Sequence, residues 1–267
     1  MLPGVHDDFD PIAAYVLNPQ LPLWAGDNNQ TFNYPQYDPG NWSRAVHQYG
    51  SYVFFIYLQE FVMDKKAVAT MISQSWSEQT SLFPQQVLFN KLASLGFSMA
   101  SIFADFAAHN VTWDYKNDVD AYKYWEQRWT ADMDSYNEAN KTIASHTTST
   151  DGWQAPPNEL LPSAWAYNVV ELNSENNASV LIEFNADEHG NAGTSSQFEV
   201  RVIIESGDSS SSSEQRTYSS LNIEDGQASQ SFQLNQGQTL WLVVASVPNL
   251  FSGNETFNYQ YKMTLKQ

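Results

Sequence analysis

The sequence contains no cysteine, which excludes disulfide bridges, cysteine-bound zinc, iron–sulfur clusters and thiol nucleophiles. Basic residues are scarce as well, since 12 Lys and Arg stand against 30 Asp and Glu and give a formal net charge of −18. Such a surface repels phosphate groups, which argues against nucleic acid and against anionic membranes as partners. We therefore expect an acidic protein that is suited to a salty or extracellular medium and binds neither nucleic acid nor membrane.

Long hydrophobic runs are also missing. The longest apolar stretch, Tyr52 to Leu58, is too short to cross a bilayer. The first residues, Met1 to Asp8, show neither the basic region nor the apolar region of a signal peptide. We expect a secreted or extracellular protein, of bacterial type, whose export signal is not present in this chain.

Motifs for self-contained catalysis are not found. The His-Glu-x-x-His helix of zinc peptidases needs two imidazoles on one helical face, and no two of the five His lie within five residues of each other. Neither a Gly-x-Ser-x-Gly elbow nor a phosphate-binding glycine loop occurs. We thus expect no metal ligand and no cofactor in this chain, with calcium left open at two acidic groups. These groups, for which solvated acidic turns are the simpler interpretation, are Asp7, Asp8 and Asp10, and Asp114, Asp118 and Asp120.

The first half of the chain has the pattern of a helical, aromatic-rich domain. Apolar residues make up 42 % of the 267 residues and aromatic residues 14 %, which is enough for a sizeable core. After a turn-rich start, apolar residues recur at helical spacing, and Ser98 is placed to cap one helix. The helices are predicted at residues 11–17, 44–63, 65–76, 84–94, 99–109 and 119–139.

The second half has the alternating pattern of short strands. A Ser/Thr/Pro-containing connector over 141–158 separates the two patterns. Strands are predicted at 164–172, 179–185, 197–205, 215–223, 228–234, 239–247 and 256–265. We therefore predict the α+β class: a mainly helical domain over 1–150, followed by an antiparallel β-sandwich of about seven strands over 159–267.

One segment resembles a known family. Residues 48–61 read Gln-Tyr-Gly-Ser-Tyr-Val-Phe-Phe-Ile-Tyr-Leu-Gln-Glu-Phe, which resembles the Tyr-Gly-x-x-Leu-Phe-x-x-Tyr-Leu-x-Glu helix of secreted gluzincin-like zinc metallopeptidases, including bacterial avirulence-type proteins. The stretches 13–23, 161–172 and 240–248 are similar to segments of the same proteins. In that family the zinc ligands lie upstream of this helix.

The resemblance implies that this chain is the C-terminal part of a metallopeptidase-like hydrolase. An N-terminal catalytic segment would be its partner, and zinc would belong only to the longer parent protein. In that arrangement His47 and Tyr49 would form a cleft wall or an electrophile facing a peptide, and the sandwich would be an accessory domain.

An alternative from a different class is an extracellular glycan- or protein-binding module without enzymatic activity. Trp165 and Tyr167 would then bind the ligand, because amphipathic rings line many carbohydrate and peptide sites. Trp241 is a weaker candidate, since it lies within an apolar strand. A glycan-active enzyme with dispersed carboxylates also stays open, because such acids meet only in the fold.

Overall fold

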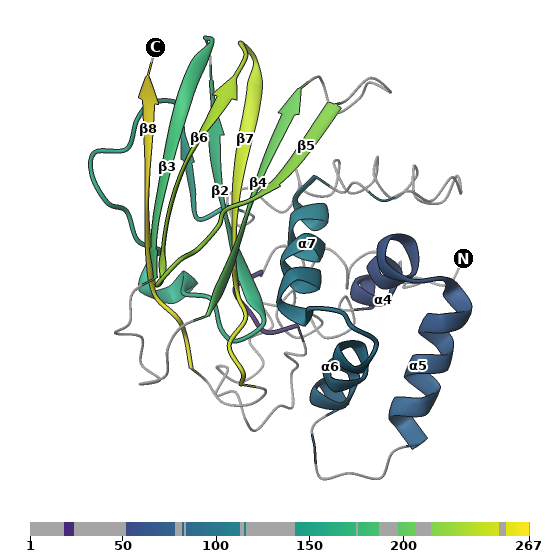
Figure 1. Ribbon diagram of the computed structural model, residues 1–267. Helices are drawn as coiled ribbons and strands as arrows, with labels where there is room; N and C mark the ends of the chain where they lie inside the picture. Colours follow the sequence, from purple (N-terminus) through teal and green to yellow (C-terminus); the bar gives the residue numbers. More distant parts are fainter. Residues whose placement is uncertain are drawn as a thin grey trace, which may run out of the picture.

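The computed structural model describes residues 19–23, 52–77, 82, 84–112, 115, 142–174, 176–186, 197–206, 215–250 and 255–266. Helices gather on one side of the molecule and a two-layered β-sandwich forms the other (Figure 1). This arrangement confirms the predicted α+β class, with a helical N-terminal part and C-terminal strands.

Local signals in the sequence explain where the helices begin and end. The Asp64 side chain accepts a hydrogen bond from the Ala67 N–H at 2.9 Å, and Ser98 accepts one from the Ser101 N–H at 3.4 Å, so both residues act as N-caps. Gly96, at φ +88°, lets the chain turn between two helices. The helices are α4 (Val53–Tyr57), which continues as a π-helical turn at Leu58–Val62, α5 (Lys65–Ser77), α6 (Pro84–Ser94) and α7 (Met99–Thr112).

These helices confirm the predictions for 65–76, 84–94 and 99–109, and for 44–63 from residue 53 onward. The start of that helix and the helices predicted at 11–17 and 119–139 lie outside the described residues. In the part of the chain that is described, no single helix is long and apolar enough to span a membrane, although the bent pair Gln85–Ser94 and Met99–Thr112 passes the same test together.

The sandwich consists of a five-stranded and a three-stranded sheet. The strand orders are β1-β2-β7-β4-β5 and β6-β3-β8, and every pair is antiparallel except β1 with β2. All seven predicted strands are present, while β1 was not predicted because three residues are too short to show alternation. The strands are β1 (Ala144–His146), β2 (Ala166–Asn173), β3 (Ala178–Ala186), β4 (Phe198–Ser206), β5 (Gln215–Ser220), β6 (Gln227–Leu234), β7 (Gln238–Ser246) and β8 (Tyr259–Lys266).

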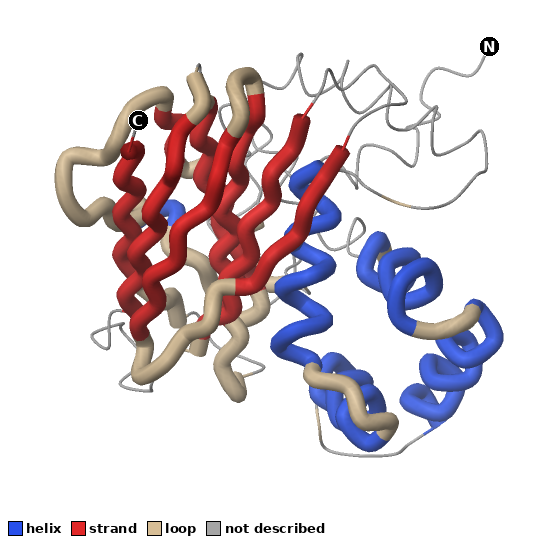
Figure 2. Tube along the Cα trace, turned by 45° about the horizontal axis from the view of Figure 1, so that its top comes forward, coloured by secondary structure: helices blue, strands red, loops and turns tan. Residues whose placement is uncertain are grey.

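Helix α7 joins the two parts of the molecule. It lies along the outer face of the five-stranded sheet and contacts β4, β7 and β2 (Figures 1 and 2). Phe103 and Phe106 of this helix are fully buried, and the Phe103 ring meets Trp165 edge-on at 5.7 Å between centroids. The hydrophobic core therefore runs without a break from the helices into the sandwich.

Candidate functional site

The residues nominated from the sequence fall into two groups. His47, Tyr49 and the two acidic groups proposed for calcium lie outside the described residues. Trp165 and Tyr167 are described, and both are buried, with 4 % and 1 % of their surface exposed. Buried rings offer no face to a glycan or a peptide, so the structure gives both side chains a packing role in place of the predicted binding role.

Trp165 is held in an unusual backbone conformation by its contacts. Its φ of +58° is rare for a bulky residue. Its indole N–H donates to the Leu250 carbonyl at 3.0 Å, and its ring packs edge-on against Phe89 at 4.4 Å between centroids. The backbone strain is therefore offset by burial at the point where the chain enters β2.

Tyr167 and Trp241 also face the protein. Burial raises the pKa of Tyr167, an effect that its interaction with Asn110 partly offsets, so the phenol stays protonated. Trp241 is half-buried, and its indole N–H donates to Glu205 at 3.1 Å, in agreement with the packing role favoured for it.

The two described histidines lie far apart in the fold. His109 near the end of α7 stacks on Phe61 at 4.1 Å between ring centroids and lies against Tyr218 at 4.7 Å. His146 in β1 is 3.2 Å from the Tyr261 hydroxyl, and burial lowers the pKa of His146. Across the described ranges, no group of three His, Asp or Glu side chains is arranged to hold a metal ion.

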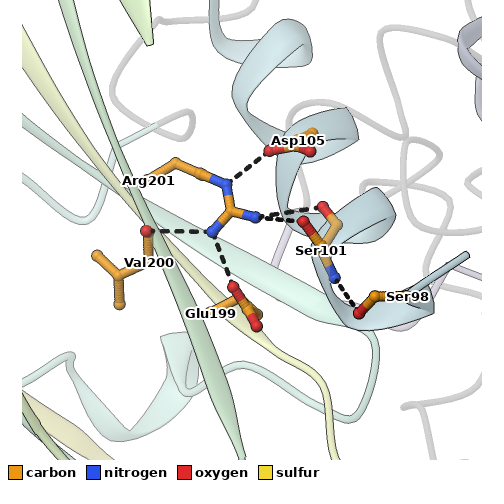
Figure 3. A network of polar contacts seen from close by, with 6 residues as sticks. All are labelled: Ser98, Ser101, Asp105, Glu199, Val200 and Arg201. Carbon is orange, nitrogen blue, oxygen red and sulfur yellow. Dashed lines mark hydrogen bonds and ion pairs between the residues drawn. The ribbon is translucent and has the colours of Figure 1, made fainter. Parts of the chain in front are cut away.

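Where α7 meets β4, a buried cation organises the polar contacts. Arg201 is 3 % exposed, and its Nε–H donates to Asp105 at 2.6 Å while Nη1 donates to Glu199 at 2.8 Å (Figure 3). The guanidinium also donates to the Val200 carbonyl and to both oxygens of Ser101. A buried charge is tolerated only when paired in this way, so the network fixes α7, β4 and the Glu199 carboxylate relative to one another.

Beside this network lies a pocket of about 450 Å³, here called the β3–β4 pocket. It lies where β3 ends and β4 begins, and residues between β5 and β6 line its other side. It combines carboxylate, amide and hydroxyl groups with apolar side chains. The residues that line it are Ala186, Gln197, Phe198, Glu199, Ser220, Leu221, Asn222, Ile223 and Gly226.

Backbone hydrogen bonds fix the walls of the β3–β4 pocket. The Leu221 N–H donates to the Val200 carbonyl at 3.1 Å, and the Ala186 N–H donates to the Gly226 carbonyl at 2.7 Å. Asp225 and Gly226 both have positive φ, the conformation of a tight type I′ hairpin turn. These bonds hold the described walls of the pocket in place, and walls that are already ordered lower the entropy lost on binding.

Glu199 is the charged group of this pocket. One of its carboxylate oxygens accepts from Arg201, and the other accepts no hydrogen bond from the described residues. The side chain is 34 % exposed, so solvent or a ligand can reach it. This role was not predicted from the sequence, although an arginine between Val200 and Val202 indicates a charged residue within the buried part of a strand.

Comparison with family models gives a match over residues 8–266, nearly the whole chain, to a family described as a family of unknown function (DUF6055). The chain belongs to this family. No curated protein matches. Among solved structures, the chain is similar to the pre-peptidase C-terminal domain of collagenase from Bacillus anthracis, at 12 % identity and a TM-score of 0.29, over 47 % of this chain and 96 % of that one. At a TM-score this low, the similarity supports no inference about the function of this chain.

Proposed function

We propose that this member of the family is an extracellular binding module without a catalytic site of its own, and that it binds a glycan in the β3–β4 pocket. The observation that carries the proposal is the Glu199 carboxylate, held by Arg201 in a pocket that also offers amide and hydroxyl groups. Sugar hydroxyls need such acceptors and donors at set positions, with apolar surface beside them.

The lining chemistry favours a neutral ligand with many hydroxyl groups over an anionic one. Glu199 and the formal net charge of −18 repel anions. Half-buried Ile223 supplies the apolar surface against which the C–H face of a sugar ring packs, while Phe198 and Leu221 are buried behind it. The Asn222 amide donates to Glu224 at 2.8 Å, which leaves its carbonyl oxygen to accept from a hydroxyl.

A glycan array with the purified chain tests this function. We expect binding of a defined glycan class that Asn222→Ala and Glu199→Gln each weaken by about tenfold, the effect of about one lost hydrogen bond to a charged or fixed group. Glu171→Gln is the matched control, because Glu171 lies in β2, does not line the pocket and accepts from the Ser145 hydroxyl. Glycan binding that survives both pocket substitutions would refute the proposed site.

The metallopeptidase hypothesis stays a prediction, since the family description names no activity. It implies a longer parent protein with a His-Glu-x-x-His helix and bound zinc. Metal analysis and peptidase assays on that longer protein, next to this chain, would test it. Peptidase activity only in the longer protein would support the hypothesis.

A further inference from the structure

The free edge of the three-stranded sheet is a second candidate interaction surface. The sheet order β6-β3-β8 leaves β6 and β8 as its two edges. Both present backbone N–H and C=O groups that β3 does not use, and such a row pairs readily with another strand unless the protein protects it. The two edges differ in that protection.

The β8 edge is covered by the connector that precedes the sandwich. Gln154 and Tyr261 exchange two backbone hydrogen bonds at 2.8 and 2.9 Å, and the Thr150 N–H donates to the Met263 carbonyl at 2.9 Å. The Leu265 N–H donates to the Ser149 hydroxyl at 2.7 Å. The chain itself therefore occupies this edge.

Beyond Gln227, the β6 edge has no such cover among the described residues. The Ala186 N–H donates to the Gly226 carbonyl, and Ala186 is opposite Gly226 in the register that continues through β6. Because hydrogen-bonded pairs alternate along an antiparallel ladder, Ser229, Ser231 and Gln233 direct their N–H and C=O groups away from β3. Gln227 is different, since it exchanges two backbone bonds with Glu224 across the tight turn.

Strand β6 also lacks the features that usually blunt an edge. It reads Gln-Ala-Ser-Gln-Ser-Phe-Gln-Leu, with no charge and no proline. Its eight residues pair with β3 without a bulge, and only Phe232 and Leu234 are buried. A long, regular and uncharged edge is well suited to receive a strand.

The charged residues near the β6 edge determine which kind of strand can bind there. Exposed Glu224 and Asp225 stand at the start of β6, and Glu183 lies beside Ser229 in the register and pairs with Lys262 at 3.1 Å. A second copy of this chain would bring another formal charge of −18 to the contact. An extended peptide with a basic residue near the turn is complementary instead.

We infer that the β6 edge binds an extended, basic segment of another protein by strand addition, with Lys or Arg beside Glu224 and Asp225. Backbone groups of Ser229, Ser231 and Gln233 hold the segment, and none of these residues lines the β3–β4 pocket. The strand-pairing part of the site is therefore separate from the proposed glycan site, whereas Glu224 also accepts a hydrogen bond from the pocket residue Asn222. Ser231 variants change only the strand-pairing part, so they test this inference independently of the glycan site.

Fluorescence anisotropy with two labelled ten-residue peptides tests this inference on the full chain. Both peptides alternate Thr and Val, and one ends in two Lys where the other ends in two Glu. We expect the Lys peptide to bind at least about tenfold more tightly than the Glu peptide, and the double variant E224Q/D225N to remove this preference. No saturable binding of the Lys peptide at millimolar concentration would overturn the inference.

Ser231 supplies a matched pair of variants. Ser231→Pro removes an outward N–H without removing a hydrogen bond to β3. The variant should therefore bind the Lys peptide about tenfold or more weakly than the parent chain does. Ser231→Ala keeps the N–H and should stay within about twofold of the parent. A folded Ser231→Pro variant that binds the Lys peptide as tightly as the parent chain does would contradict the inference.

Amide hydrogen exchange gives a readout that does not depend on any variant. The amides of Ser229, Ser231 and Gln233 should exchange fast in the free chain and slowly with the Lys peptide, whereas Gln230 and Phe232 should be slow in both. If the three outward amides exchange equally fast with and without bound peptide, the peptide binds at another site and the inference is wrong. A dimer seen by light scattering that Ser231→Pro abolishes would assign the edge to a second copy and overturn the inference.

Discussion

The two sheets of the sandwich differ in what covers their outer faces. In the five-stranded sheet, α7 lies on the outer face, and every residue of β7 from Leu242 to Ser246 is buried. In the three-stranded sheet, β3 alternates buried and half-buried residues from Ala178 to Asn185, so the side chains of its outer face stay partly accessible to solvent. The covered sheet thus anchors the helices, while the uncovered sheet has the free edge and one wall of the pocket.

Truncating a ring between α7 and the covered sheet should have the largest effect. Phe103 is fully buried against Trp165 and Phe106, so Phe103→Ala should lower the free energy of unfolding by about 3–5 kcal/mol through lost burial and a cavity. The comparison is Leu181→Ala on the outer face of β3, where a half-buried side chain should cost about 1 kcal/mol. Urea denaturation measures both, and equal losses would mean that α7 does not anchor the sheet.

The ion pairs of the two sheets should differ by a smaller amount. Asp105→Asn weakens the pairing of buried Arg201 and should cost about 1–3 kcal/mol, towards the lower end because Asp105 is 44 % exposed and Glu199 remains. Lys262→Met removes the partly exposed pair with Glu183 on the other sheet and should cost about 0–1 kcal/mol. A loss for Lys262→Met as large as that for Asp105→Asn would remove the distinction between covered and uncovered sheet.

The smallest expected effect is a dependence on pH where edge strands of the two sheets meet. His146 of β1 lies against Tyr261 of β8, and burial lowers the pKa of His146, so the fold favours the neutral imidazole. This stabilisation is fully present above the ordinary pKa of 6.5 and is lost as the pH falls through the lowered pKa of the folded state. Because His146 is only partly buried, solvent screening keeps this contribution to stability small.

Thermal unfolding of the parent chain and of His146→Gln between pH 7 and pH 5 checks this prediction. The parent should lose slightly more stability on acidification than the variant does. An equal loss of stability in the parent chain and the variant would show that protonation of His146 does not affect the stability of the fold.

Much of the fold was readable from local patterns. Ser98 as a cap, the helices at 65–76 and 84–94 and all seven long strands follow from hydrophobic period and turn residues. Strand β1 was missed because its three residues are held by parallel pairing with β2, a contact between distant segments. Local patterns cannot report such pairing.

The candidate sites were much less predictable. Trp165 and Tyr167 were nominated because exposed aromatic rings bind ligands, yet α7 and its neighbours bury them. Glu199 and Asn222 come together in the pocket only because β4 and the β5–β6 connection close against the end of β3. Exposure and proximity both depend on segments far apart in the sequence.

By itself, the sequence determined the class of the protein: acidic, free of cysteine, helical first and β-stranded afterwards. Only the tertiary structure decided which charges are buried, which sheet edge is covered and where a pocket opens. The physical reason is that periodicity is a local property of the chain, whereas burial and electrostatic pairing arise from contacts such as that of Arg201 with Asp105, 96 residues apart.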